Sequence, residues 1–304
     1  YACRSTHAPE PGPLKRLAAL LTLFVFAGGA QSQDAVNAEP DEPGERRYGF
    51  FSGDYEPSDP LKYTYEIEPF VWYVSPGGDV GYARGTATVN TKNLSIDDPA
   101  LYGGAEFHVV HDKWRFSLLG AVSGQNGASV QATARTLGTL SVAAGDTLRT
   151  EVELNTASLR AGYRIWEFES DPNERGVPEI SSAVELVGGV RAFDYSLESE
   201  ITAGGTTGSV EGDMFHLEPI VGAKWEIHFQ DQYSIDFSSN FGYLPELDDQ
   251  SSSSLDLTVG FKYRPTPNVG AQIGYRLLVF DLESDEVEAE GALAGLYGGI
   301  AIRF

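Results

Sequence analysis

The sequence predicts an all-β protein, a transmembrane antiparallel up-and-down β-barrel of about 10–12 strands. Three observations predict it. Apolar and polar residues alternate with period two over most of the chain after Leu61, tight turns alternate with long polar connections, and an export signal precedes the strands. The 304 residues carry 44 Asp and Glu against 21 Lys and Arg, a formal net charge of −23. This excess of acid disfavours binding to nucleic acid or to anionic lipid.

The chain is expected to open with targeting sequence: residues 1–30 read as upstream residues followed by a signal peptide with its core at 14–30. Lys15 and Arg16 precede a short apolar run, and small residues end at Ala30. A basic region, an apolar run and small residues in this order are typical of a secretory signal peptide, whereas the alternative is a buried helix. The run is shorter than the roughly 18 apolar residues that a membrane-spanning helix needs.

Residues 31–60 are expected to form a flexible acidic leader, because they combine several prolines with acidic side chains. The barrel is expected to occupy residues 61–304. Cys3 is the only cysteine, so the sequence offers neither a disulfide framework nor a cysteine-based zinc site. No cofactor and no metal site are expected.

Residues 232–243 illustrate the alternation. Tyr233, Ile235 and Phe237 share one face with later aromatics, whereas Ser234 and Asp236 lie on the other. A soluble β-sandwich would alternate in the same way. The apolar faces, however, run over about ten residues and carry aromatics near their ends, which fits a membrane-spanning strand and its aromatic girdle, whereas soluble strands average about five or six residues.

The connections also favour a barrel, because tight turns at 111–114, 230–232 and 265–268 alternate with long polar stretches near 125–147, 198–213, 244–254 and 281–291. The expected strands are residues 63–74, 80–90, 103–111, 114–124, 148–165, 182–196, 215–229, 232–243, 254–264, 268–282 and 288–304. Bacterial barrels have an even number of strands. Either one strand near 47–51 has been missed, or residues 82–90 belong to a loop.

The end of the chain carries a predicted assembly signal. Ile300, Ile302 and the terminal Phe304 share one face of the last strand. Together with Phe261–Arg264, Gly274–Leu277 and Glu68–Tyr73, this tail resembles a broad group of uncharacterised bacterial outer-membrane, porin-like β-barrel proteins. The resemblance spans most of 65–304 and implies the fold, a location in the bacterial outer membrane, and the barrel assembly machinery, membrane lipid and lipopolysaccharide as partners. It implies no chemistry.

The inward faces of the expected strands are rich in charge. Two interpretations stay open: a pore lining that selects ions, or a salt-bridged plug that satisfies a polar interior. The candidate lumen-lining residues are Glu106, His108, Arg115, Arg160, Arg164, Glu185, Arg191, Glu218, Lys224, Glu226, Asp236, Asp256, Lys262, Arg264 and Arg276.

An acidic outer loop is expected near the end of the chain, and it could hold divalent cations with lipopolysaccharide or be a solvated strand extension. Its residues are Asp281, Glu283, Asp285, Glu286, Glu288 and Glu290.

Enzymatic signals are weak. Four histidines follow the signal peptide, and no serine lies in a Gly-x-Ser-x-Gly context, although Ser209, Glu211, Asp213 and His216 are neighbours in the sequence. The sequence therefore favours a barrel that is not an enzyme and that allows passive diffusion of small solutes through a narrow lumen of mixed charge. The alternatives are a closed barrel acting through its acidic outer loops, or a lipid-modifying or proteolytic barrel.

Overall fold

The computed structural model describes residues 63–304 except 83–86, 174–177, 204–205, 231 and 248. The expected signal peptide and leader lie outside these residues. Among the described residues, no helix is long and apolar enough to cross a membrane.

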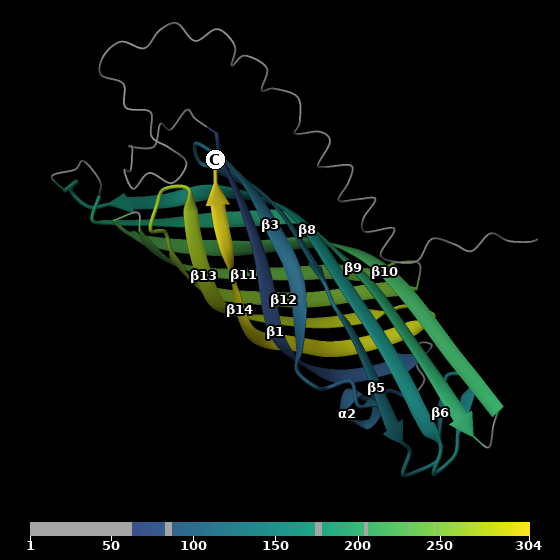
Figure 1. Ribbon diagram of the computed structural model, residues 1–304. Coiled ribbons are helices and arrows are strands. Elements are labelled where there is room, and N and C mark those ends of the chain that lie inside the picture. The colour runs from purple at the N-terminus through teal and green to yellow at the C-terminus, as the bar shows by residue number, and fades with distance from the viewer. Residues whose placement is uncertain (1–62, 83–86, 174–177, 204–205, 231, 248) are drawn as a thin grey trace, which may run out of the picture. The chain divides into compact units, whose positions relative to one another are not determined.

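Ten antiparallel strands form a closed ring, since each pairs with its neighbour in the chain and the last pairs with the first (Figure 1). In order they are β1 (Thr64–Tyr82), β3 (Ala100–His111), β4 (Trp114–Val122) continued by β5 (Gly124–Val130), β8 (Thr147–Glu169), β9 (Ile180–Ala203), β10 (Thr206–Phe229), β11 (Tyr233–Leu247), β12 (Gln250–Tyr263), β13 (Val269–Glu283) and β14 (Val287–Arg303). The fold is thus the predicted up-and-down barrel, in which closure leaves no unpaired strand within the membrane.

The number of strands settles the alternative at 80–90. Residues up to Tyr82 complete β1, whereas Val89–Asn90 form only the short strand β2. The four-residue helix α2 (Thr91–Leu94) follows, and Asn90 caps it by accepting a hydrogen bond from the Lys92 amide. The segment is therefore a connection between barrel strands, and the expectation of a separate strand at 80–90 is wrong.

At the end near the C-terminus, residues 170–179 form a longer connection between β8 and β9, whereas the connections at 111–114, 230–232 and 265–268 are the tight turns that the sequence predicts. At two of them, Asp112 and Gln230 adopt left-handed backbone conformations with φ of 53° and 50°. At the other end, the polar stretches at 198–213, 244–254 and 281–291 are mainly continuations of strands. The expectation of long loops there is wrong. Polar residues can form β-strands in water as readily as apolar residues form them in lipid, so these strands extend beyond the membrane.

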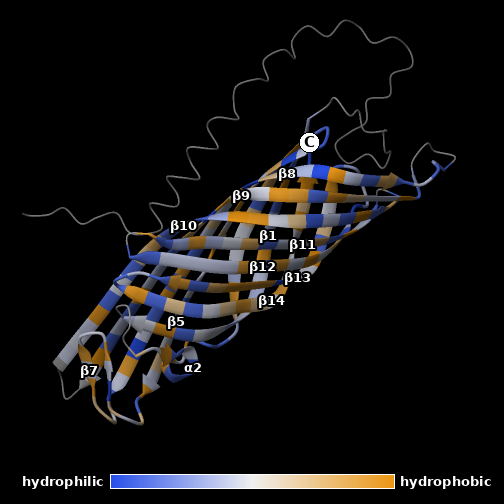
Figure 2. Cartoon of the chain, turned by 180° about the vertical axis from the view of Figure 1, so that it is seen from behind, coloured by the Kyte–Doolittle hydropathy of each residue, from blue (hydrophilic) through white to orange (hydrophobic). Residues whose placement is uncertain are grey.

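Outward-facing side chains divide the barrel into a membrane band and an outer part. On β10, the outward residues from Phe229 to Val221, where β11 is also paired, are apolar and mark the membrane band, and beyond them lie Leu217 and Phe215 and then the acidic Asp213 and Glu211. Aromatic rings gather near the tight turns, with Trp114 and Tyr163 centroids 4.9 Å apart and Tyr233 and Tyr263 centroids 5.0 Å apart. Figure 2 shows hydrophobic and hydrophilic residues following one another along the strands.

Beyond the band, the strands β5, β8, β9 and β10 continue as a curved sheet, here called the outer sheet (Figure 1). Its inner face and the outer half of the barrel interior share one apolar core. This core also takes in the hairpin of β6 (Arg135–Leu137) and β7 (Leu140–Val142). Its members include Trp72, Tyr102, Leu94, Leu148, Phe193, Tyr195, Leu278, Phe280 and Leu282.

Candidate functional site in the barrel lumen

Charged side chains fill the half of the lumen nearer the tight turns, and we call this set the charged belt. Each lies at an inward position of a strand, where alternation places polar residues opposite the lipid-facing ones. Nearest the chain ends, Glu66 Oε1 lies 3.1 Å from Lys262 Nζ and 2.6 Å from Arg264 Nη2. Lys262 also pairs with Glu68.

The middle of the belt joins strands that are not neighbours in the ring. Arg115 on β4 lies 3.1 Å from a carboxylate oxygen of Glu185 and also pairs with Glu226. Lys224 lies 2.8 Å from the other oxygen of Glu226. Arg160 pairs with Glu106 in the same layer. Opposite charges therefore meet across the interior, as buried charges require if they are to stay ionised.

The belt ends where the apolar core begins. Asp256 accepts two hydrogen bonds from Arg276, at 3.0 and 2.8 Å, and one from Arg191 at 3.1 Å. The guanidinium of Arg276 lies 5.1 Å from the centre of the Trp72 ring, and that of Arg191 lies 5.9 Å from the ring of Phe193. Both arginines thus bind a carboxylate on one side and an aromatic face on the other.

Glu218 completes this layer. Its carboxylate accepts hydrogen bonds from the hydroxyl groups of Ser252, at 3.1 Å, and Ser254, and it lies 3.6 Å from Arg191. The side chain is fully buried. A carboxylate in this position is stabilised by several donors at once, which a charge inside a protein needs.

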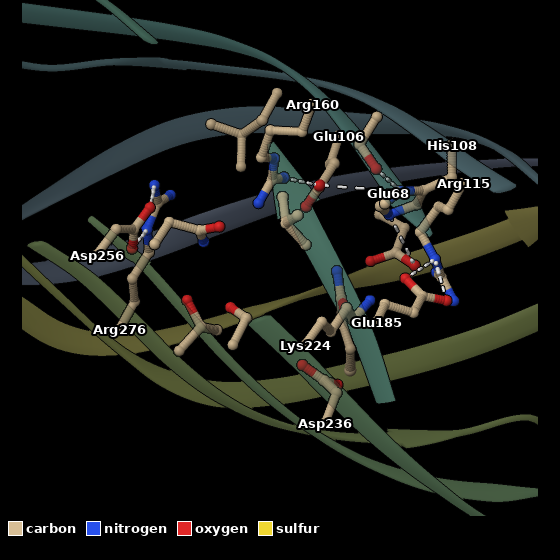
Figure 3. Close-up of a pocket in the computed structure, with 18 of the residues that line it drawn as sticks. Glu68, Glu106, His108, Arg115, Arg160, Glu185, Lys224, Asp236, Asp256 and Arg276 are labelled. Carbon is tan, nitrogen blue, oxygen red and sulfur yellow. Dashed lines mark hydrogen bonds and ion pairs between the residues drawn. The ribbon is translucent and has the colours of Figure 1, made fainter. Parts of the chain in front are cut away.

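A cavity of about 90 Å³ remains between these side chains. Figure 3 shows the ion pair of Asp256 and Arg276 at one end of the cavity and the ion pair of Arg115 and Glu185 at the other. An ordered water needs roughly 10–15 Å³ of such volume, so the cavity has room for several waters. Asn240 contributes a buried Oδ1 atom without a hydrogen-bond partner to its wall.

One polar chain in the cavity has the composition of a hydrolytic triad. His108 Nδ1 lies 2.8 Å from Ser117 Oγ, and His108 Nε2 lies 3.8 Å from Glu68 Oε1. All three side chains are buried and line the cavity. A catalytic triad would need space for a substrate carbonyl beside the serine, whereas here ion pairs of the belt lie around it. The contact between His108 and Ser117 satisfies one hydrogen bond of each buried side chain.

The residues predicted to line the lumen all lie in or beside this belt. Ten of them line the cavity: Glu106, His108, Arg115, Arg160, Glu185, Lys224, Asp236, Asp256, Lys262 and Arg276. Three of the rest, Arg191, Glu226 and Arg264, form ion pairs with these residues or with Glu66, and Glu218 forms one with Arg191. Arg164, next to a β-bulge, pairs with Glu167 at 2.7 Å and reaches Glu185 at 4.0 Å.

Sequence reasoning missed four residues of the site: Glu66, Glu68, Trp72 and Ser117. The first three follow from the alternation of β1, in which Tyr65, Ile67, Val71 and Tyr73 are outward and exposed. Ser117 carried no signal, because a serine on an inward face is ordinary in such a strand.

The proposed neighbourhood of Ser209, Glu211, Asp213 and His216 does not form a site. His216 is at an even position of β10 and is fully buried in the interior, whereas the other three are at odd positions and exposed on the outside. Residues an odd number apart on a strand point to opposite faces. Their proximity in the sequence therefore does not bring the side chains together.

The expected acidic loop is a strand hairpin with a tight turn. Asp281 and Glu283 lie on β13, Glu288 and Glu290 on β14, and Asp285 and Glu286 in the turn. Asp281 is directly opposite Glu290, and burial followed by the charges of Glu283, Glu290 and Glu288 raises its pKa above the ordinary value. Among the described residues, no group of three or more His, Cys, Asp or Glu side chains is arranged to hold a metal ion.

The predicted assembly signal lies at the closing seam of the barrel. Ile300 and Ile302 are on β14, which pairs with β1 and β13. Phe304 follows β14 and is exposed, and its amide donates a 2.8 Å hydrogen bond to the carbonyl of Tyr65. The last residue of the chain thus takes part in closing the ring.

No protein-family model and no curated protein matches the sequence. Solved structures do match. The outer membrane protease OmpT from Escherichia coli is similar with a TM-score of 0.46 and 11% identity, over 80% of this chain and 99% of that chain. Neisserial surface protein A gives 0.32 and 13% over 79% and 97%, and the toluene transporter TodX from Pseudomonas putida gives 0.27 and 10% over 79% and 89%. At such identities and TM-scores the similarity carries no conclusion about this chain beyond the up-and-down β-barrel architecture described above.

Proposed function

We propose that this barrel is closed to solutes and functions as a membrane anchor for the outer sheet, through which it interacts with partners at the cell surface. The sequence alone favours passive diffusion. One observation supports a closed barrel: side chains occupy the lumen along its length. The charged belt occupies one end and the apolar core the other.

The belt supports closure because its charges are engaged with one another. In a selective pore, charged groups bind the passing ion in place of its water. Here Arg115 and Arg191 instead hold carboxylates of strands that are not their neighbours, and Arg276 holds that of the adjacent strand. An ion entering the belt would have to displace a buried partner, and breaking such a pair costs about 3–5 kcal/mol.

The apolar core supports closure at the other end. Trp72, Phe193, Leu278 and Leu282 are at most 2% exposed. The cavity left in this region is about 50 Å³, smaller than the one in the belt. A hydrated ion would lose most of its water there against a mainly apolar lining.

Nor do we propose an enzyme. The triad-like chain of Ser117, His108 and Glu68 lies inside the belt, away from lipid and from the outer sheet. We expect the assembly machinery and outer-membrane lipid to be partners of the barrel wall, and surface molecules to be partners of the outer sheet.

Single-channel recording of the full-length chain in a planar bilayer tests this proposal. We expect no discrete steps across several salt concentrations, with insertion verified separately by the slower migration of unfolded chains after heating. A control variant combines Trp72→Ala, Phe193→Ala and Arg276→Ala, which removes three large side chains where belt and core meet, and should produce brief openings. Steady, ion-selective steps from the unaltered chain would show that the lumen is open.

A further inference from the structure

The two edges of the outer sheet differ. At one edge, the strand β5 is covered by the segment 93–98, since Ser129 Oγ and Gln131 Nε2 donate to the carbonyl of Asn93, at 3.1 and 3.3 Å, and Gln125 donates to that of Asp98. At the other edge lies β10. Proteins usually cover or otherwise protect a long sheet edge, because its unpaired amide and carbonyl groups bind other strands.

The edge formed by β10 is long. This strand pairs with β9 from Thr206 to Phe229 without interruption, but its pairing with β11 begins only at Ile220. In the described part of the chain, residues 207–219 therefore have β9 as their only strand partner. Figure 1 shows this end of β10 at the margin of the outer sheet, past the point where β11 turns away.

Two prolines account for the separation of β10 from β11. Pro219 immediately precedes the first pair with β11, and Pro245 lies in the part of β11 where the register is irregular. Because proline has no amide hydrogen, it cannot donate to a ladder. The separation is therefore encoded in the sequence of both strands.

Pro219 also shows which backbone groups are free. Pro219 is opposite Val190, and the β9–β10 ladder is not interrupted there. Because proline has no amide hydrogen to donate to β9, its nitrogen must point away from β9, toward the other edge of β10. Along a strand, residues two apart point their amides to the same edge and their side chains to the same face. Glu211 and Asp213 thus point their amides to the free edge and their carboxylates to the outside.

The charge beside this edge selects the partner. Glu151, Glu198 and Glu211 are directly opposite one another on β8, β9 and β10. None of the three makes an ion pair within the described residues. Like charges in such a row repel, and a cation on the next strand would relieve the repulsion. Nearer the membrane the outward residues are Phe215 and Leu217, 46% and 53% exposed.

We propose that residues 207–219 of β10 bind an extended segment of a basic protein partner by strand addition. The partner would carry lysine or arginine opposite Glu211 and Asp213, and apolar side chains opposite Phe215 and Leu217. A second copy of this chain fits poorly, because its own β10 would bring carboxylates against carboxylates. The proposal rests on the proposed function, since it names the surface and the class of partner.

A peptide-binding experiment tests it. The probe is a blocked ten-residue peptide with valine at alternate positions of its N-terminal half, lysine at alternate positions of its C-terminal half and threonine elsewhere, so that an antiparallel register places valine opposite Phe215 and Leu217 and lysine opposite Glu211 and Asp213. It is added to the full-length chain in detergent micelles. We expect saturable binding that weakens with added salt, because salt shortens the reach of the charges. Two further versions are N-methylated on one or the other set of alternate residues; both keep the charge, and the one whose methyl groups face β10 should not bind. A version with glutamate in place of lysine reverses the charge and should not bind either.

Variants separate the backbone from the charge. Glu211→Gln removes one carboxylate and should weaken binding about threefold. Glu211→Pro also removes the edge amide, and should weaken it about tenfold more by the loss of one or two hydrogen bonds. Neither variant should change the folded fraction, because this amide is not used in the barrel. If Glu211→Pro unfolds the chain, chemical ligation can be used to replace Asp213 with N-methyl-aspartate. This residue also lacks the amide hydrogen at the free edge, so it provides the same test.

Three results would overturn the proposal. Binding of both N-methylated peptides, methylated on either set of alternate residues, would mean electrostatic adhesion without strand addition. Equal binding of the acidic peptide would remove the charge argument. A dimer that Glu211→Pro dissociates would identify a second copy as the occupant. Conductance of the same sample decides the proposed function separately, because an open lumen would leave the peptide result unaffected.

Discussion

In the lumen, the buried carboxylates of Glu185, Glu226 and Asp256 each lie against an arginine, whereas on the outer sheet Glu151, Glu198 and Glu211 stand opposite one another. The same strands, β8, β9 and β10, run through both regions. The difference follows from water. An unpaired charge in the interior costs several kcal/mol, but on a hydrated surface its repulsion of a neighbour costs only a fraction of this.

The comparison also separates two tasks. The paired lumen holds the barrel in one arrangement and leaves little net charge inside it. The outer sheet presents carboxylates without partners, and so carries a field that a cation or a basic protein can neutralise. Four substitutions would break or sharpen this contrast, in order of expected effect.

The largest effect is expected from Asp256→Ala. This change leaves Arg276 buried without its carboxylate and Arg191 with Glu218 alone, so the free energy of unfolding should fall by about 3–5 kcal/mol. Equilibrium unfolding in urea, in micelles, measures it. The matched change on the outer sheet, Glu198→Gln, should have little effect or stabilise slightly. Equal losses from the two variants would show that the lumen and the sheet treat charge alike.

A smaller loss is expected from Gly212→Ala. A methyl group at this position of β10 would come 2.5 Å from the side chain of Val287 and 3.0 Å from the carbonyl oxygen of Glu286. The outer sheet must then move away from the β13–β14 turn, at a cost of about 1–3 kcal/mol. Gly188→Ala, where the methyl group meets nothing within 4 Å, is the control and should be neutral in the same unfolding assay.

Ser117→Ala should cost about 1 kcal/mol, because it removes the hydrogen bond to His108. A fluorophosphonate probe, which labels activated serines, should label neither the unaltered chain nor the variant. Labelling that depends on Ser117 would instead mean that the lumen admits a substrate and that the triad-like chain is catalytic.

The smallest effect concerns pH. Because the pKa of Asp281 is raised in the folded barrel, the folded state binds more protons than the unfolded state between the ordinary and the raised pKa. The contribution of Asp281 to stability therefore falls as pH rises through this window. Asp281→Asn should be slightly more stable at neutral pH, by about 0.5 kcal/mol or less at this exposed site, and its advantage should vanish in acid. A constant difference across the pH range would contradict the raised pKa.

Alternation in the sequence was sufficient to predict the fold and the inward face of β4, β8, β10, β12 and β13. It placed Arg276 and Asp256 inside, because each follows an outward apolar residue by one position. It did not predict the ends of the strands at the outer side, where polar residues on both faces look like a loop. It also could not reveal the partner of each charge, since Arg191 and Asp256 are 65 residues apart and on strands that are not neighbours.

The sequence by itself determined the barrel, its lipid-facing surface and the excess of acid, because these depend on local period and composition. Only the tertiary structure decided that the lumen is filled and that β10 leaves β11 at Ile220. Both depend on the number of strands and on how far each strand is shifted against the next. These set which side chains meet across the interior and where a strand loses its neighbour.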